Sequence, residues 1–585
     1  MAEDEIAITG FSAYFPQANH LKEFKEKLYA GVDMVTDDES RWPRGFLGLP
    51  SRSGKIRDLT KCDVRFFTVH PEFAHWTDPQ VRLLLETSYE AIVDAGYDPA
   101  MLRGRRVGVY VGVSTSESAD AASINLERIN SFSAIGSSRA MVSNLISYAL
   151  DFPRMSVDTA CSSTFTALHE AVLSLRSGIC DAAIVGGSNL TLNPSTALKY
   201  KCLGILSDDG ACKGFDARAN GYARSETVGV FFLQRVSDAR RIYAKVINVS
   251  TNTDGYKTVG IGTPSAAMQE KLLRQVYADA NIDPCDVGYV EAHGTGTMAG
   301  DATEVTAISN VFCPPWRKGA LHIGSVKSNV GHAEAASGIC SVAKTILALE
   351  TGTIAANLHF TEPRPDILAL HDGRIEVVDK PTAMTGGPIG ISSFGVGGTN
   401  AHVILEPNKG PHVDSMPRDK PELPRLVLMA GRTKDSLKRT LNNLEAEGPY
   451  PDSGYALLNR IGQPSVDQFR YRGYAIVPVD GSGKKVIKEV NQAPFDKRPL
   501  WFVFAGMGSQ WNGMARQMMQ FDAFARSIYK SHDILERVGV DLLDFLTEDM
   551  AKHPSSVSQF VTVSAVQVGL LLYTSNFSWD LTKSY

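Results

Sequence analysis

Apolar runs of strand type alternate with helical patterns of apolar residues from the start of the chain to about residue 407. Strands that alternate with helices in this way are typical of an α/β domain. The expected strands end in glycine or small residues in most cases, which favours functional sites at the strand ends. The strands are predicted at 107–113, 182–187, 287–292, 321–326 and 401–406, and the helices at 79–95 and 333–350.

A polar segment rich in proline interrupts this alternation. Proline favours extended backbone and interrupts helices, so a domain boundary is expected here. Beyond it, a smaller α/β unit is predicted, with strands at 426–431 and 474–479 and a helix between them. The prolines are Pro407, Pro411, Pro417, Pro421 and Pro424, and Leu437, Leu441 and Leu444 share one face of the predicted helix.

A third unit opens near residue 496 with LWFVFAGMGSQW (500–511), an apolar strand pattern that leads into a glycine loop. The unit spans about ninety residues, which is short for a complete α/β domain. The predicted domains are therefore 1–407, 408–495 and 496–585, the last of them incomplete.

The stretch VDTACSSTFTALHEA (157–171) places Cys161 between a strand end and an amphipathic helix. Apolar residues recur there at three- and four-residue spacing, and Gly178 ends the helix. A cysteine at a helix N-terminus is expected to have a depressed pKa and to form a thiolate. Most cysteines are small core residues, however, so burial without chemistry is the alternative. The helix pattern consists of Phe165, Leu168, Val172 and Leu175.

Two histidines occupy similar places in the pattern. His293 in EAHGTGT and His332 in KSNVGHAEAASG each follow a predicted strand and have a glycine beside them. A lone histidine is more often structural, but one cysteine and two histidines at strand ends of one domain suit nucleophilic catalysis. Zinc binding is the rival use, and it is disfavoured because the short ligand spacing of structural zinc sites is missing. No metal site is predicted.

Composition narrows the function classes. Among 585 residues, 43% are hydrophobic and 21% are charged, and the net charge is -5, so neither nucleic acid nor an anionic membrane is indicated as a partner. No apolar run is expected to reach the roughly 18 residues of a membrane-spanning helix. The start of the chain lacks the pattern of a signal peptide. The eight cysteines are scattered, which favours a reducing compartment and a cytoplasmic protein.

DTACSS, EAHGTGT and KSNVGH, in this order and spacing, resemble the β-ketoacyl synthase family of condensing enzymes. ISSFGVGGTNAHVIL (391–405) and GFDARANGYARSE (214–226) match further blocks of that family. VDMVTDDESRWPRGFLGLPSRSGK (32–55) and GMGSQW are similar to the animal type I fatty acid synthases and the related animal polyketide synthases. The resemblance extends to about residue 570.

The resemblance implies a thiolase-like fold, two related halves stacked as αβαβα, followed by a small α/β linker domain and a truncated α/β acyltransferase segment. It implies a homodimer. Cys161 would take an acyl chain from a phosphopantetheine thioester. Malonyl on acyl carrier protein would then lose CO2, with His293 and His332 stabilising the negative charge. The product would be a 3-ketoacyl chain two carbons longer.

Further roles follow from the same resemblance. The backbone N–H groups of Cys161 and Val396 would form the oxyanion hole, and Lys327 would pair with Glu304 to support the site. Thr295, Thr297 and Phe394 would contact the substrate and its pantetheine arm. No cofactor is expected to be bound by this segment itself, because the substrates arrive on acyl carrier protein.

The sequence departs from the family pattern at several places. Valine stands at Val396 where the family often has a gating phenylalanine, and Ala302 replaces a common proline. The segment DFPRMSVDTACSS is about two residues shorter than usual. GMGSQW would supply an oxyanion donor near Met507, but the transferase nucleophile belongs in a GxSxG motif, and none occurs. No transferase activity and poor packing beyond about residue 565 are predicted.

Three other interpretations stay open at this point. The same condensation could belong to a polyketide pathway, or the chain could be a truncated, inactive fragment that dimerises. A thiolase is disfavoured because that family uses a second cysteine and one histidine.

GSGKK (481–485) is interpreted as a turn, since a phosphate-binding loop needs a glycine at Pro478 and Ser or Thr at Lys485.

Overall fold

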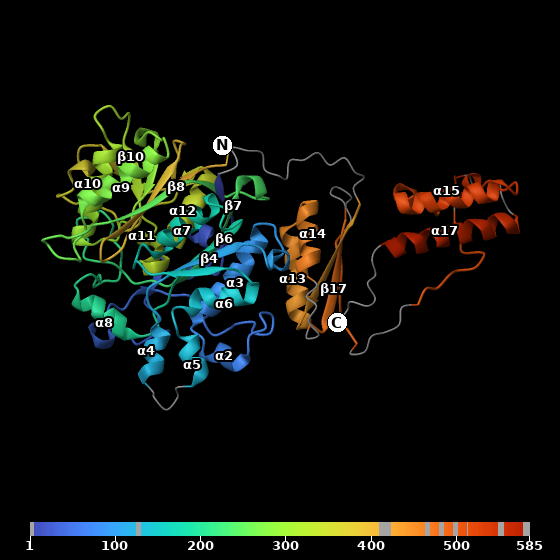
Figure 1. The fold of residues 1–585 in the computed structure, drawn as a ribbon, viewed down its shortest axis with the longest axis horizontal. Helices are drawn as coiled ribbons and strands as arrows, with labels where there is room; N and C mark the ends of the chain where they lie inside the picture. The colour runs from blue at the N-terminus through green and yellow to red at the C-terminus, as the bar shows by residue number, and fades with distance from the viewer. Residues whose placement is uncertain are drawn as a thin grey trace. The chain divides into compact units, whose positions relative to one another are not determined.

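The computed structural model describes residues 5–124, 130–408, 423–462, 469–478, 485–494, 501–511, 513–547 and 555–576. The chain divides into two compact units (Figure 1). Met1–Pro421 and Tyr450–Arg460 form the first unit, and Glu422–Pro449 and Ile461–Tyr585 form the second. The interior of the proline-rich segment and most of GSGKK lie outside the described residues.

The first unit is built on an eleven-stranded sheet with the order β12-β10-β9-β14-β15-β8-β1-β7-β6-β4-β5. Its strands are β1 (Ile6–Tyr14), β4 (Val107–Val113), β5 (Arg154–Val157), β6 (Ala182–Asn189), β7 (Thr227–Arg235), β8 (Ala244–Thr253), β9 (Tyr289–Glu291), β10 (Leu321–Gly324), β12 (Ile375–Val377), β14 (Ile389–Phe394) and β15 (Thr399–Glu406). Two short pairs stand apart, β2 (Val35–Thr36) with β3 (Ser53–Gly54) and β11 (Thr353–Ile354) with β13 (Thr382–Ala383).

The sheet consists of two halves with the same pattern. In the first half, β5, β4 and β6 run parallel, and β7 and β1 follow antiparallel. In the second half, β10, β9 and β14 run parallel, and β15 and β8 follow antiparallel. The two halves join where β1 pairs with β8. β5 therefore corresponds to β10, and β4 corresponds to β9.

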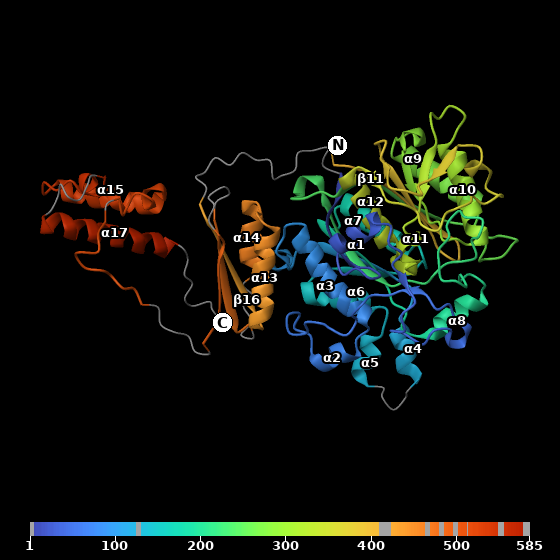
Figure 2. The ribbon, with the colours of Figure 1, turned by 180° about the vertical axis from the view of Figure 1, so that it is seen from behind.

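Helices form three layers around these two halves. α7 and α12 pack between the halves, α3 and α6 cover the outer face of the first, and α9 and α10 lie on the outer side of the second (Figure 1). From behind, α1 lies beside α12 (Figure 2). The helices are α1 (Leu21–Tyr29), α2 (Pro71–Trp76), α3 (Pro79–Asp94), α4 (Glu117–Ile124), α5 (Ser131–Gly136), α6 (Met141–Leu150), α7 (Ser163–Arg176), α8 (Pro194–Cys202), α9 (Ala266–Asp279), α10 (Met298–Phe312), α11 (Lys327–Val330), α12 (Ser337–Thr351) and α14 (Asp452–Ile461).

The elements that the hydrophobic pattern predicted lie close to their observed bounds, although many further strands and helices were not predicted. The helix expected at 79–95 is α3, which Asp78 caps by accepting the N–H of Gln80. The helix expected at 333–350 begins later, because Glu334–Ala336 form a 3-10 turn before α12. Glu334 has a φ of 46°, which the continuous apolar pattern did not indicate.

The first part of the second unit is a three-stranded antiparallel sheet with one helix packed on it. The strands are β16 (Arg425–Gly431), β17 (Tyr471–Val477) and β18 (Ile487–Gln492), in that order, and the helix is α13 (Lys434–Glu447). Leu437, Leu441 and Leu444 are buried, as their shared face predicted. Most of α14 belongs to the first unit rather than to this one.

The described residues of 501–576 are helical where they are regular. Their helices are α15 (Asp522–Glu536), α16 (Leu542–Thr547) and α17 (Ser556–Asn576). The strand predicted in LWFVFAGMGSQW is wrong for the residues described there, and Trp501 and Val503 are 79% and 90% exposed. A strand needs a neighbour for its backbone N–H and C=O groups, and the described residues of 501–576 include no strand.

The last helix, α17, contradicts the expectation that no apolar run could span a membrane and agrees in part with the expected poor packing near the end of the chain. Ser556–Thr574 is long and apolar enough to cross a membrane by length and composition, contrary to the expectation that no run would be. The core helix of a folded domain passes the same test, and Ala565 and Val566 of α17 pack in a cluster with Phe524 of α15. Beyond these residues, Leu570, Leu571 and Leu572 remain 37–47% exposed, but Tyr573 packs against Phe521, so the poor packing predicted beyond about residue 565 is seen only in part.

Candidate active site

Cys161 lies where β5 turns into α7, in the first half of the sheet. The residue before it, Ala160, has a φ of 54°, a left-handed conformation that non-glycine residues rarely adopt. Two hydroxyl groups hold the Cys161 carbonyl oxygen, that of Ser337 at 3.2 Å and that of Ser393 at 2.9 Å. The shortened segment before Cys161 still forms β5 and pairs in register with β4. The thiol is therefore fixed by elements from both halves of the sheet.

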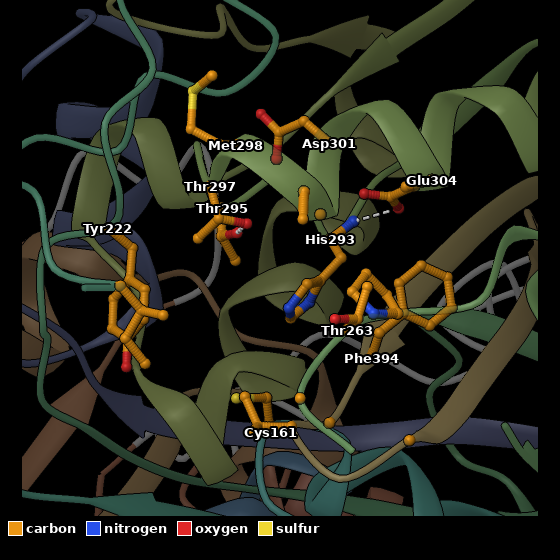
Figure 3. A pocket seen from close by; sticks show the side chains of 18 of the residues that line it. Cys161, Tyr222, Thr263, His293, Thr295, Thr297, Met298, Asp301, Glu304 and Phe394 are labelled. Carbon is orange, nitrogen blue, oxygen red and sulfur yellow. Dashed lines mark hydrogen bonds between the residues drawn. The ribbon is translucent and has the colours of Figure 1, made fainter. Parts of the chain in front are cut away.

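His332 lies at the corresponding place in the second half, after β10 and before α12. Its Nε2 is 3.1 Å from the Sγ of Cys161. His293 follows the neighbouring strand β9, and its ring lies 5.2 Å from that of His332 at an interplanar angle of 89°. The three side chains line one cavity of about 310 Å³, in which Figure 3 labels Cys161 and His293. The structure thus brings together the cysteine and both histidines that the sequence singled out.

A glycine loop, residues 395–398, carries a backbone donor to the thiol. The N–H groups of Val396 and of Cys161 itself lie within hydrogen-bonding reach of Sγ. Gly395 packs so closely that an added Cβ would lie 2.3 Å from the Thr159 carbonyl oxygen. Gly397 and Gly398 have φ values of 109° and 99°. These donors face the place where an oxyanion would form on an acyl group at Cys161.

The charge state of Cys161 differs from the sequence expectation. Burial, with a smaller contribution from the Glu334 carboxylate, raises the pKa of Cys161 to about 12. The two backbone donors and the Lys327 ammonium act in the opposite direction, but desolvation of the charged form outweighs them. The predicted depressed pKa is wrong, because the thiol at the helix start is buried. The resting form of Cys161 is a neutral thiol.

Both histidines are neutral as well. Burial lowers the pKa of His293 and of His332 well below its usual value, and the nearby Lys327 ammonium lowers both further. The Nδ1 atom of each ring has no hydrogen-bond partner among the described residues. A buried N–H without an acceptor is rarer than an unsatisfied acceptor, so we infer that each ring carries its proton on Nε2. At His332 this places the N–H beside Cys161 Sγ.

Glu304 does not pair with Lys327 as the resemblance implied. Its two carboxylate oxygens accept the backbone N–H groups of His293 at 2.7 Å and of Gly294 at 2.8 Å (Figure 3). The Lys327 ammonium is buried and has no hydrogen-bond partner in the described part of the chain. Burial raises the pKa of Glu304 to about 7. Glu304 therefore positions the loop that carries His293, and Lys327 acts on the site through its charge.

The three residues expected at the substrate all line the cavity. The hydroxyl groups of Thr295 and Thr297 lie 3.2 Å apart on the loop after His293. The Phe394 ring lies 5.8 Å from that of His293. Figure 3 shows the two threonines on one side of His293 and Phe394 on the other. Val396 is 60% exposed at the cavity wall, where it adds an apolar surface.

A buried ion network beside His332 was missed by the sequence reasoning. The Arg224 guanidinium donates to Glu334 at 2.7 Å and to Glu117 at 3.1 Å, and all three side chains are buried. The backbone around Arg224 also pairs with His332, whose N–H donates to the Ala223 carbonyl oxygen at 2.8 Å. Arg224 in GYARSE and Glu334 in GHAE are visible in the sequence, but a single sequence does not show which charged side chains form ion pairs.

The described residues hold no group of three or more His, Cys, Asp or Glu side chains that could bind a metal ion. The site instead offers a thiol, two neutral imidazoles and two backbone donors in one cavity. This set suits transfer of an acyl group to sulfur, followed by stabilisation of an enolate.

Comparison with known proteins agrees with this chemistry. Residues 3–239 match the N-terminal domain of β-ketoacyl synthase, and residues 243–361 match its C-terminal domain. The fatty acid synthase of Anser anser anser is 50% identical over 351 residues, which are 60% of this chain and 99% of the goose sequence. The chain belongs to the β-ketoacyl synthase family. Residues 363–476 match the ketoacyl-synthetase C-terminal extension, and residues 501–576 match the acyl transferase domain.

Polyketide synthases are also similar to this ketosynthase. A phenolphthiocerol/phthiocerol polyketide synthase of Mycobacterium tuberculosis is 38% identical over 544 residues. The match covers 88% of this chain but only 28% of the mycobacterial protein's length.

Solved structures show the same fold. The oxazolomycin ketosynthase domain of Streptomyces albus superposes with a TM-score of 0.74 at 29% identity, covering 83% of this chain and 90% of that one. A ketosynthase of the bacillaene synthase from Bacillus subtilis gives a TM-score of 0.72 at 31% identity, covering 81% and 82%. The first unit therefore has the thiolase-like ketosynthase fold, as predicted.

Proposed function

We propose that this chain is a β-ketoacyl-ACP synthase that lengthens acyl chains in fatty acid synthesis by decarboxylative condensation with malonyl-ACP. The observation that carries the proposal is the meeting of Cys161, His332 and His293 in one cavity with the Val396 N–H. The 50% identity to a fatty acid synthase favours this pathway.

In the first step, Cys161 takes the acyl group. Its sulfur attacks the thioester carbonyl carbon, and the N–H groups of Cys161 and Val396 stabilise the oxyanion. The bond between the acyl carbon and the carrier sulfur then breaks. The thiol proton of Cys161 leaves with the carrier thiol, so the charge balances. Because the resting thiol is neutral and the thiolate is the nucleophile, the thiol proton must leave sulfur as the attack takes place.

In the second step, malonyl thioester loses CO2. The electron pair of the broken C–C bond moves toward the thioester oxygen, where the Nε2–H groups of His293 and His332 stabilise the developing charge. The resulting carbanion attacks the acyl carbon on Cys161, and the bond to Sγ breaks. The products are CO2, a 3-ketoacyl thioester and the Cys161 thiolate, which then takes up a proton.

The remaining assignments rest on the family. Acyl carrier protein would present its substrates on a phosphopantetheine arm, and the protein would act in the cytoplasm as a homodimer with no cofactor of its own. Residues 501–576 would have no transferase activity, because no GxSxG motif supplies a nucleophile. We expect no acyl transfer from malonyl-CoA to a carrier protein when this chain is assayed alone.

A polyketide pathway is the second candidate, and Val396 favours it. A valine at the cavity wall leaves more room than a larger side chain would. Condensation assays with malonyl-ACP and methylmalonyl-ACP, across acyl primers of several lengths, test both proposals. Preference for malonyl and saturated primers supports fatty acid synthesis, and preference for methylmalonyl or branched primers supports the polyketide pathway. Absence of any 3-keto product from the folded protein would contradict both.

A further inference from the structure

A short backbone pairing holds His332 in place. The His332 N–H donates to the Ala223 carbonyl oxygen at 2.8 Å, and the His332 carbonyl oxygen accepts the Ser225 N–H at 3.0 Å. Arg224 lies between these two partners and is the residue that pairs with His332 across the bridge. In the part of the chain that the structure describes, no hydrogen bond fixes the ring at Nδ1. The place of the His332 ring therefore depends on what holds these three residues.

The side chain of Arg224 is fixed by two buried carboxylates. Its Nε donates to Glu334 Oε1 at 2.7 Å and its Nη2 donates to Glu334 Oε2 at 3.3 Å, a two-pronged contact that leaves the guanidinium little freedom. Nη2 also donates to Glu117 at 3.1 Å. Glu334 lies only two residues after His332. The backbone pairing and the ion pair therefore connect Arg224 to the same turn of the chain at two places.

The turn that carries Glu334 needs such a contact. Glu334 has a φ of 46°, and a non-glycine residue keeps this left-handed conformation only where the surrounding structure enforces it. The turn leads from His332 through the 3-10 helix at 334–336 into α12. Because the Glu334 carboxylate is bound to Arg224, the ion pair stabilises this conformation, and with it the direction in which the chain leaves His332.

Glu117 connects the ion pair to the half of the sheet that carries Cys161. It is the first residue of α4, and its Oε2 accepts the N–H groups of Leu192 and Asn193, both at 2.6 Å. These three residues follow β4 and β6 of the first half, whereas His332 follows β10 of the second. The network therefore joins the two halves whose catalytic residues, Cys161 and His332, must meet.

Resting on the proposed function, we propose that Arg224 and Glu334 are positioning residues that direct the Nε2–H group of His332 toward the enolate that develops during decarboxylation. A donor misplaced by about 1 Å can cost roughly 10²-fold in rate. Acylation uses the backbone N–H groups of Cys161 and Val396 instead, so it does not depend on this ion pair. The two steps therefore distinguish a positioning role from general stabilisation of the fold.

The test measures both steps in the full chain. Acylation of Cys161 by a medium-chain acyl-pantetheine is followed by intact mass. CO2 release from malonyl-pantetheine is measured on protein whose Cys161 is already acylated. Urea denaturation verifies that each variant is folded.

Two variants change the ion pair in different ways. Arg224→Lys keeps the positive charge but lacks the planar fork that binds a carboxylate at two points. Arg224→Met combined with Glu334→Met removes both partners, which is often neutral for stability because no unpaired charge of the pair is left behind. Glu117 keeps its two backbone donors in both variants.

We expect kcat for CO2 release to fall about 3- to 10-fold in Arg224→Lys and about 10- to 100-fold in the double variant, with KM changed less than about threefold. Acylation should change less than about threefold in both. Arg41→Lys is the matched control, because Arg41 makes a similar two-pronged contact to the buried Glu226, with both distances at 2.7 Å. It should leave both steps within about twofold of the unmodified protein.

A double-mutant cycle with His332→Ala separates the two roles further. Once the imidazole is removed, nothing remains to be positioned, so Arg224→Lys should lower CO2 release less than about twofold in that background. A full additional loss there would overturn the inference, as would an equal loss in both steps or unchanged CO2 release in both Arg224 variants.

The unmodified protein distinguishes failure of the inference from failure of the proposed function. If it acylates Cys161 and releases CO2 while the variants give one of the contradicting results, only the inference fails. If it carries out neither step, the proposed function fails, and the inference fails with it.

Discussion

Two glycine loops of this chain follow similar apolar sequences but lie in different surroundings. ISSFGVGGTN forms β14, a packed turn at 395–398 and the start of β15, and it places the Val396 N–H beside Cys161. In LWFVFAGMGSQW, Trp501, Phe502, Val503 and Phe504 are 55–90% exposed, and Gly506 has nothing within 4 Å of its added Cβ.

The difference between the loops lies in their neighbours. β14 has β9 on one side and β15 on the other, so its backbone groups are paired and its side chains are buried. The described part of 501–576 offers no such strand. The comparison shows that an apolar run ending in glycine indicates a strand and an oxyanion loop only where the fold supplies strands beside it.

The largest expected effect concerns the pH dependence of the thiol that the packed loop encloses. Because burial raises the pKa of Cys161 to about 12, the reactive thiolate fraction increases about tenfold per pH unit below that value. Alkylation of Cys161 by iodoacetamide should therefore rise roughly 1000-fold between pH 7 and pH 10. Peptide mass spectrometry follows Cys161 separately from the other cysteines. A plateau near pH 8 would show that the backbone donors of the loop lower the pKa of Cys161 by more than burial raises it.

The second effect concerns the imidazole N–H groups of His293 and His332, which line the same cavity as the packed loop. His332→Ala should reduce decarboxylation of malonyl thioester by about 10²–10³-fold, because one donor to the developing charge is lost. Release of CO2 is measured on protein whose Cys161 is already acylated, which separates this step from the first. His322→Ala, at a histidine on β10, is the control and should change the rate less than about twofold. An unchanged rate in His332→Ala would remove this residue from the mechanism.

The third effect tests the two loops directly with one matched change. Gly395→Ala places a Cβ 2.3 Å from the Thr159 carbonyl oxygen, so the loop must shift and its donor must move away from Sγ. Acylation of Cys161 should fall by about tenfold or more. Gly506→Ala meets nothing within 4 Å and should leave acylation unchanged. Equal effects of the two substitutions on acylation would contradict the claim that only the packed loop supports Cys161.

The smallest effect concerns the open segment. Phe504 is 55% exposed, so Phe504→Ser should change the acylation rate of Cys161 less than about twofold and leave the denaturant midpoint of the first unit unchanged. Phe394→Ser, at the buried counterpart before the packed loop, should lower both. A strong effect of Phe504→Ser on acylation would show that the open segment supports the active site.

The sequence predicted the arrangement of the site better than its chemistry. Cys161, His293 and His332 meet because each follows a strand of one sheet, and strand positions are readable from the hydrophobic pattern. The pKa of Cys161 was not predictable, because its direction depends on how far the cavity excludes water. The partners of Glu304 were missed for a similar reason, since backbone N–H groups have no signature in the sequence.

The same limit applies to the buried ion network around Arg224. Arg224 and Glu334 are separated by 110 positions in the chain, and nothing in a single sequence links them.

The central claim is that Cys161 accepts the acyl group, and intact mass tests it most directly. The protein is incubated with a medium-chain acyl-pantetheine thioester beside a Cys161→Ala control, and circular dichroism verifies that both are folded. We predict an increase of one acyl group in the unmodified protein and none in Cys161→Ala. A folded protein without an adduct, or an equal adduct on Cys161→Ala, would contradict the assignment of Cys161 as the nucleophile.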